Sequence, residues 1–134
     1  MIDFQGTGQS HILRDIAILD SAIRFQLLPA EEATLRERLH MEEDLCSIER
    51  FSQVEQLAAK SPKENQALAK AYATVLHLRT LAGKLVERNP NADLSEYHIA
   101  LFYTALNTLQ FSSLADIQRE HALLSASLLV DQLE

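Results

Sequence analysis

Glu37 and His40 are the first residues whose types and spacing could support chemistry. On a helix, a Glu and a His three residues apart lie on one face, as the metal ligands of di-metal helical bundles do. Asp44, four residues after His40, would add a third ligand. A bridged di-metal site requires a second Glu-x-x-His pair, and the sequence has none. We keep Glu37, His40 and Asp44 as weak metal candidates, and we predict no resident metal and no cofactor.

His121 falls on an apolar face of the last predicted helix. A neutral imidazole is stable there if each ring nitrogen has a partner, so we interpret it as a core or interface histidine. A general base would need a nucleophile and an orienting acid, and nothing in the sequence places Cys46, the single thiol, beside His121. One cysteine also excludes an internal disulfide. We find no catalytic set and predict that the protein is not an enzyme.

Arg79 is a basic residue in the middle of an apolar stripe, one turn from Val75 and Ala82. An unpaired buried charge is costly, so this guanidinium group must reach solvent, pair with a carboxylate or face a partner. We predict that Arg79 pairs with a carboxylate of residues 30–60 or with a second chain. Reaching solvent at the edge of the core is the alternative.

The elements that position these residues are predicted to be helices. Three Gly and three Pro in 134 residues are too few for the turns of a sheet protein. Apolar residues recur at helical spacing, and the predicted helices cover residues 10–28, 30–60, 61–88, 93–111 and 113–133. The stripe of the second range changes register, which predicts a kink or break near Ser47. We predict an all-α, single-domain antiparallel bundle of about five helices over residues 10–134, after a flexible arm at residues 1–9.

Local signals mark the predicted helix ends. Ser10 is predicted to cap the first helix, and the run from Ser61 to Glu64 has the spacing of a capping box with Pro at the first helical position. Asp93 begins a second capping-box pattern. The helix that follows is apolar on nearly every side, and the stripe predicted to face the core consists of Ile99, Phe102, Leu106 and Leu109.

The first and last helices each have more than one apolar face. On the first helix, Asp20 and Arg24 are predicted to pair on the narrow polar strip that remains. A bundle of this size has difficulty burying two faces on both terminal helices. We therefore predict an adaptor, chaperone or subunit of a larger assembly that binds a protein partner or a second copy of itself. The residues predicted to make this contact are Arg79, Ile18, Phe25, Leu129 and Leu133.

The net charge of −7, from 12 Lys and Arg against 19 Asp and Glu, favours some partners over others. An acidic chain without a basic run repels phosphate backbones, which argues against nucleic-acid binding. Glu42, Glu43 and Asp44 suggest an alternative function, a regulator that binds a basic protein. A small metal-binding or enzymatic bundle is the other alternative. No window has the about 18 apolar residues of a membrane span and no secretory signal is recognisable, so we expect a cytoplasmic protein.

Overall fold

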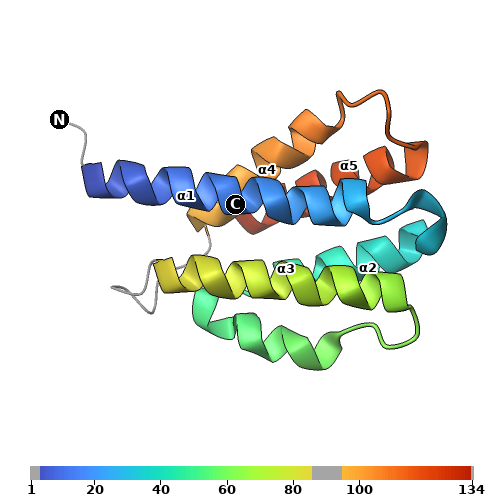
Figure 1. The fold of residues 1–134 in the computed structure, drawn as a ribbon, viewed down its shortest axis with the longest axis horizontal. Helices are drawn as coiled ribbons and strands as arrows, with labels where there is room; N and C mark the ends of the chain where they lie inside the picture. The colour runs from blue at the N-terminus through green and yellow to red at the C-terminus, as the bar shows by residue number, and fades with distance from the viewer. Residues whose placement is uncertain (1–3, 86–94, 134) are drawn as a thin grey trace.

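The computed structural model describes residues 4–85 and 95–133, and the regular elements in this part of the chain are helical. The prediction of an all-α bundle is confirmed (Figure 1). No helix among the described residues is long and apolar enough to cross a membrane. The α-helices are α1 (Phe4–Ser21), α2 (Leu35–Cys46), α3 (Gln66–Leu85), α4 (Ser95–Thr108) and α5 (Asp116–Leu133). The π-helical turn η1 (Ala22–Leu27) extends α1, and the 3-10 helices are η2 (Ala30–Glu32) and η3 (Phe51–Lys60).

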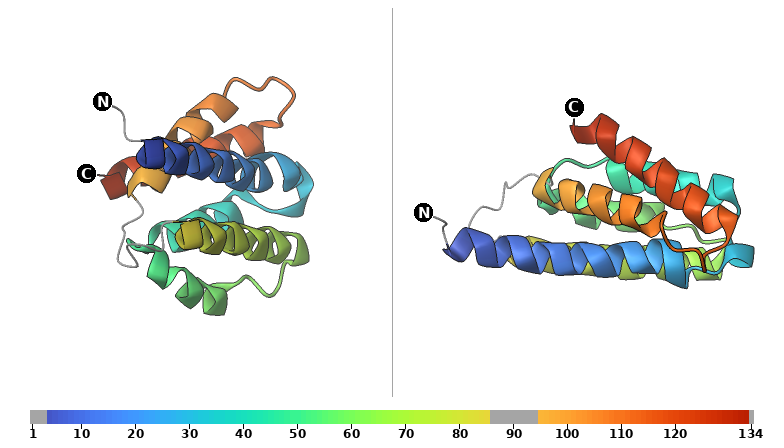
Figure 2. Two further views of the ribbon diagram at one scale, coloured as in Figure 1. Left: turned by 60° about the vertical axis from the view of Figure 1, so that its left-hand side comes forward. Right: turned by 90° about the horizontal axis from the view of Figure 1, so that it is seen from above.

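The helices pack around a shared interior in which α1 has a central place. α1 packs against both α3 and α4, and α5 packs against α4 and α2, while η3 lies along α3 (Figure 2). α1 and α3 run in opposite directions (Figure 1). α2 and α5 run in the same direction, because Arg38 contacts His121 near their starts and Ile48, just beyond α2, contacts Gln132 near the end of α5. Side chains from all five α-helices therefore reach one central region.

The predicted break near Ser47 is confirmed. α2 ends at Cys46 with Ser47 as its C-cap, and η3 begins at Phe51. The N–H and the hydroxyl of Ser47 both donate to the Asp44 carbonyl, at 3.1 and 2.6 Å. These bonds satisfy a carbonyl of the last turn, which would otherwise lack a partner. The break allows α2 and η3 to bury different faces.

The predicted start of the second helix is wrong by about one turn. α2 begins at Leu35 rather than directly after Pro29. The Thr34 hydroxyl accepts the Glu37 N–H at 3.1 Å, and the Glu37 carboxylate accepts the Thr34 N–H at 3.0 Å. This reciprocal capping box fixes the start of α2.

The predicted start of the third helix is also wrong. α3 begins at Gln66, and Ser61 instead ends the preceding 3-10 helix. The side-chain oxygen of Asn65 accepts the Leu68 N–H at 3.1 Å, and the Asn65 amide donates to Glu37 at 3.1 Å. Asn65 therefore caps α3 and links it to the start of α2.

Four further helix ends differ from prediction or lie outside the described residues. α1 begins at Phe4, so residues 4–9 of the predicted arm are helical and Ser10 lies inside the helix. Glycines lower helix propensity by about 1 kcal/mol each without forbidding the helix. α5 begins at Asp116 rather than near Ser113. Residues 1–3, the predicted cap Asp93 and the predicted end near Arg88 lie outside the described residues.

α4 buries a different face from the one predicted. Ile99 and Leu106 of the predicted stripe are exposed, and Phe102 and Leu109 are half-buried. The residues that α4 buries are Tyr97, His98, Leu101, Ala105 and Thr108. The face that enters the core is thus partly polar, and apolar side chains remain on the outside. The polar side chains inside contribute to a central polar network, and the apolar side chains outside contribute to a groove between α1 and α4.

Candidate functional site

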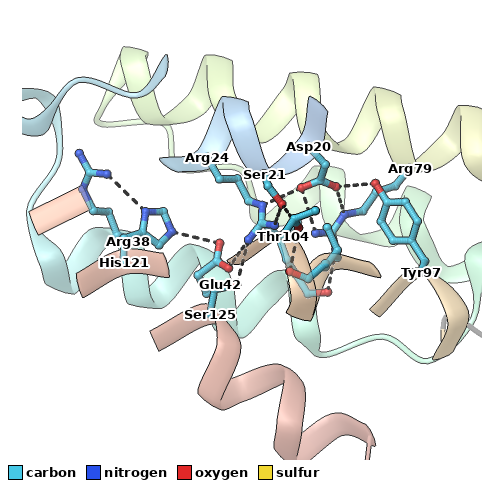
Figure 3. Close-up of polar contacts among 12 residues, drawn as sticks. Asp20, Ser21, Arg24, Arg38, Glu42, Arg79, Tyr97, Thr104, His121 and Ser125 are labelled. Atoms are coloured by element: carbon cyan, nitrogen blue, oxygen red, sulfur yellow. Dashed lines mark hydrogen bonds and ion pairs between the residues drawn. The ribbon is translucent and has the colours of Figure 1, made fainter. Parts of the chain in front are cut away.

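A polar network occupies the centre of the bundle, and the Asp20 carboxylate of α1 is its hub (Figure 3). Asp20 is fully buried. One of its oxygens accepts a hydrogen bond from Arg24 Nε at 2.6 Å. The other accepts from Arg79 Nε at 2.8 Å and from the Tyr97 hydroxyl at 2.7 Å. One carboxylate thus joins α1 to η1, α3 and α4.

Arg24 connects Asp20 to a second buried carboxylate, Glu42 of α2. Its Nη1 donates to Glu42 at 2.5 Å and to the Ser125 hydroxyl of α5 at 3.0 Å. Its guanidinium carbon lies 4.5 Å from the centroid of the Phe25 ring. Arg24 and Phe25 are adjacent in sequence, and both are buried. The wider π-helical turn of η1 contains this buried pair.

His121 of α5 extends the network from Glu42 to Arg38. Its Nε2 lies 3.2 Å from a Glu42 oxygen, and its Nδ1 lies 3.3 Å from Arg38 Nη1. Arginine can only donate, so Nδ1 accepts and Nε2 carries the hydrogen that points to Glu42. The Nε2–Glu42 contact is close but does not meet hydrogen-bond geometry, and neither atom has a hydrogen bond to another described residue. Arg38 also donates to the Pro29 and Ala33 carbonyls, at 2.7 and 3.2 Å, so backbone dipoles offset its charge.

These pairings keep the two acids ionised and the histidine neutral. Burial raises the pKa of Asp20, but Arg79 and Arg24 together more than offset this effect and hold the pKa below its ordinary value. Burial also opposes ionisation of Glu42, yet Arg24 and His121 lower its pKa to about 2. For His121, burial lowers the pKa and outweighs the opposing effect of Glu42.

The predicted pairing of Arg79 is right in kind and wrong in partner. Arg79 is 2% exposed and pairs with Asp20 of α1, not with a carboxylate of residues 30–60. Asp20 and Arg24 do pair one turn apart as predicted, but in the core instead of on an exposed strip. Burial also leaves Arg79 no surface to offer a second chain. Tyr97 and Arg38 also belong to the network and were not predicted, because the spacing of apolar residues does not mark their positions as buried polar sites.

The apolar residues predicted to contact a partner separate into two groups. Ile18 is 49% exposed, as a contact residue must be. Phe25 and Leu129 are buried, so the prediction that they meet a partner is wrong. Phe25 instead packs edge-on against His121, with ring centroids 4.8 Å apart. The side chain of Leu133 lies outside the described part of the structure.

The predicted acidic surface is smaller than the sequence indicates. Glu42 is 1% exposed and committed to the network, so it cannot meet a basic partner. Glu43 is exposed and Asp44 half-exposed. Cys46 follows on the same helix, and burial raises the pKa of its thiol to about 11, which keeps it protonated near neutral pH.

The metal candidates lie on the outer side of α2. The Glu37 carboxylate already accepts hydrogen bonds from the Thr34 N–H and from Asn65. His40 is 78% exposed, and its Nε2 is 3.9 Å from an Asp44 oxygen. Within residues 4–85 and 95–133, no group of three or more His, Cys, Asp or Glu side chains is arranged to hold a metal ion.

A groove of about 850 Å³ lies between α1 and α4. Four exposed apolar side chains line it, and they are Ile18, Ile99, Tyr103 and Leu106. Its charged lining residues are Arg14 of α1 and Glu96 of α4, both exposed. Neither forms an ion pair with a described residue. The groove therefore has two apolar walls with a charge of opposite sign on each.

Thr104 of α4 links the groove to the network. It lines the groove, and its hydroxyl is 2.6 Å from the Ser21 hydroxyl. The Ser21 hydroxyl in turn accepts from Arg24 at 3.4 Å (Figure 3). The wall of the groove is thus anchored to the central ion pairs.

Comparison with known proteins gives one family. The model described as "Ternary complex associated domain 9" matches residues 1–110, which include α1 to α4 and end before α5. No curated protein and no solved structure matches the chain.

Proposed function

The chain belongs to the ternary complex associated domain 9 family, and from this premise we propose that it is a non-enzymatic protein-interaction module. It acts as an adaptor or subunit of a larger assembly and binds its partner through the groove between α1 and α4. The observation that carries the proposal is the gathering of Ile18, Ile99, Tyr103 and Leu106 on this one surface. Contiguous exposed apolar surface costs solubility and marks interaction sites, and aromatic residues are enriched at the centres of protein interfaces.

The state of the reactive groups supports the non-enzymatic part of the proposal. Asp20 and Glu42 are ion-paired, and the two ring nitrogens of His121 lie 3.2 Å from Glu42 and 3.3 Å from Arg38. The Cys46 thiol has a raised pKa and is a weak nucleophile near neutral pH. These side chains stabilise the bundle and are poorly placed to receive a substrate.

Other partner classes receive less support. A basic protein that binds the acids of α2 would meet Glu43 and Asp44 without Glu42. The net charge of −7 disfavours nucleic acid. A cytoplasmic location remains part of the proposal, and cell fractionation with the native protein would test it.

Quantitative co-isolation of the tagged protein from its native host tests the proposed function. Ile99→Glu and Tyr103→Glu place a charge in the groove, whereas Leu81→Glu and Leu123→Glu do so at exposed apolar positions on α3 and α5. We expect the groove variants to lose the co-isolated partner at least tenfold and the control variants to retain it. Circular dichroism must show that all four variants are folded. Equal loss in both pairs, or retention in the groove pair, would contradict the proposal.

A further inference from the structure

The groove has the form of a seat for one helix. Ile99, Tyr103 and Leu106 follow one another at helical steps along α4 and form a ridge on one wall. Arg14 and Ile18, four residues apart on α1, form the facing wall. Amphipathic helices bind proteins by laying an apolar face into grooves of this kind, with anchor side chains one turn apart.

We propose that the occupant is a single amphipathic α-helix of another protein. Its apolar face contacts Ile99, Tyr103 and Ile18, an acidic side chain faces Arg14, and a basic side chain faces Glu96. This inference rests on the proposed function and adds the chemistry of the partner.

The charges of the groove support this occupant. Arg14 and Glu96 are exposed, have opposite signs and form no ion pair with a described residue. A helix with one acid and one base beside its apolar face pairs with both charges in one orientation only. Exposed pairs of this kind contribute specificity and direction more than affinity.

A second copy of the chain fits the same surface less well. In a two-fold dimer the same patch meets itself, and two concave surfaces placed face to face leave a void. Close packing across an interface requires a convex surface opposite a concave one. Each copy also has a net charge of −7, so two copies repel each other.

Designed peptides of about 18 residues, long enough to form a helix, test the inference directly. Each has a leucine stripe with one Glu and one Lys beside it, and the set contains both orders of the two charges at several spacings. Binding is measured by fluorescence anisotropy and mapped by NMR on the full chain. We expect shifts at Ile99, Tyr103 and Leu106, and a preference of about fivefold for one charge order, as an exposed ion pair provides.

The double variant Arg14→Glu/Glu96→Arg reverses both groove charges while keeping the net charge of the chain. We expect it to prefer the opposite charge order by a similar factor.

The inference is overturned if no peptide shifts the groove resonances at about 1 mM, which corresponds to only about 4 kcal/mol of binding. It is also overturned if the double variant does not invert the preference, or if light scattering shows a dimer that Tyr103→Glu dissociates. If the peptides fail while Tyr103→Glu still loses the native partner, the groove is an interaction site for a different occupant, and the proposed function stands.

Discussion

The central network and the α1–α4 groove share Thr104, yet their charges are arranged in opposite ways. In the network, Asp20 and Glu42 are buried and each is paired with arginine. In the groove, Arg14 and Glu96 are exposed and have no ion-pair partner among the described residues. Polar atoms occupy the inside of α4 while apolar side chains remain outside.

This contrast separates a region that holds the fold from one that is available to a partner. A buried ion pair has already lost its hydration, so removing one member leaves an uncompensated charge. An exposed apolar side chain contributes little to folding, because water surrounds it before and after the chain folds. Substitutions in the network should therefore change stability, and substitutions in the groove should change binding.

The largest effect is expected for Asp20→Asn. This change removes the negative charge that Arg24 and Arg79 share, and we expect a loss of about 3–5 kcal/mol in the free energy of unfolding. Urea unfolding followed by circular dichroism at pH 7 measures it. Asp15→Asn, at an exposed position of α1, is the matched control and should change stability by less than about 0.5 kcal/mol. Similar stabilities for the two variants would place Asp20 outside the stabilising network.

A somewhat smaller loss, about 3 kcal/mol, is expected for Arg79→Leu. Asp20 keeps Arg24 and the Tyr97 hydroxyl as partners in this variant, so its charge remains partly compensated. Lys84→Leu removes an exposed positive charge from the same helix and is the control. Partner co-isolation should not change in either variant once folding is confirmed. A folded Arg79→Leu protein that loses its partner would mean that Arg79 acts beyond the core.

Acidification should weaken the network in two stages. His121 has a lowered pKa in the folded chain, so the unfolded chain binds the proton more readily and stability falls as the pH drops below about 6.5. Glu42 contributes stability above its ordinary pKa of 4.5, and this contribution of about 3 kcal/mol is lost as the pH approaches about 2. Urea titrations between pH 7 and pH 2 measure both stages. His121→Gln should flatten the curve between pH 6.5 and 5, and an unchanged slope would assign that stage to another group.

The smallest effect on stability is expected for Tyr103→Ala. The side chain is 65% exposed, so the free energy of unfolding should change by no more than about 0.5 kcal/mol. Thermal unfolding measures this change, and partner co-isolation should nevertheless decrease. A loss above about 2 kcal/mol would show that the groove belongs to the core and would remove the contrast between the two regions.

The sequence predicts part of the fold and part of the central network, and the predictions that were wrong have physical reasons. The helices and the break at Ser47 follow from local periodicity. Arg79 stood out because a charge on an apolar stripe needs a partner, but choosing Asp20 as that partner requires the three-dimensional packing of α1 against α3. The prediction chose the wrong buried face for α4, because this helix is apolar on nearly every side and periodicity does not single out one face. Its buried face is instead fixed by hydrogen bonds to α1, from the Tyr97 hydroxyl to Asp20 and between the hydroxyls of Thr104 and Ser21.

The π-helical turn at Ala22–Leu27 has a consequence for how related sequences can vary in length. A π-turn is equivalent to an α-helix with one inserted residue. Deleting one residue there would restore regular α-geometry and leave α1 almost as long, at little local cost. Without the wider turn, however, neighbouring side chains would point about 100° apart, so Arg24 and Phe25 could not both remain inside. A related chain with a single-residue gap at this turn should therefore supply the arginine that joins Asp20 to Glu42 from a different position.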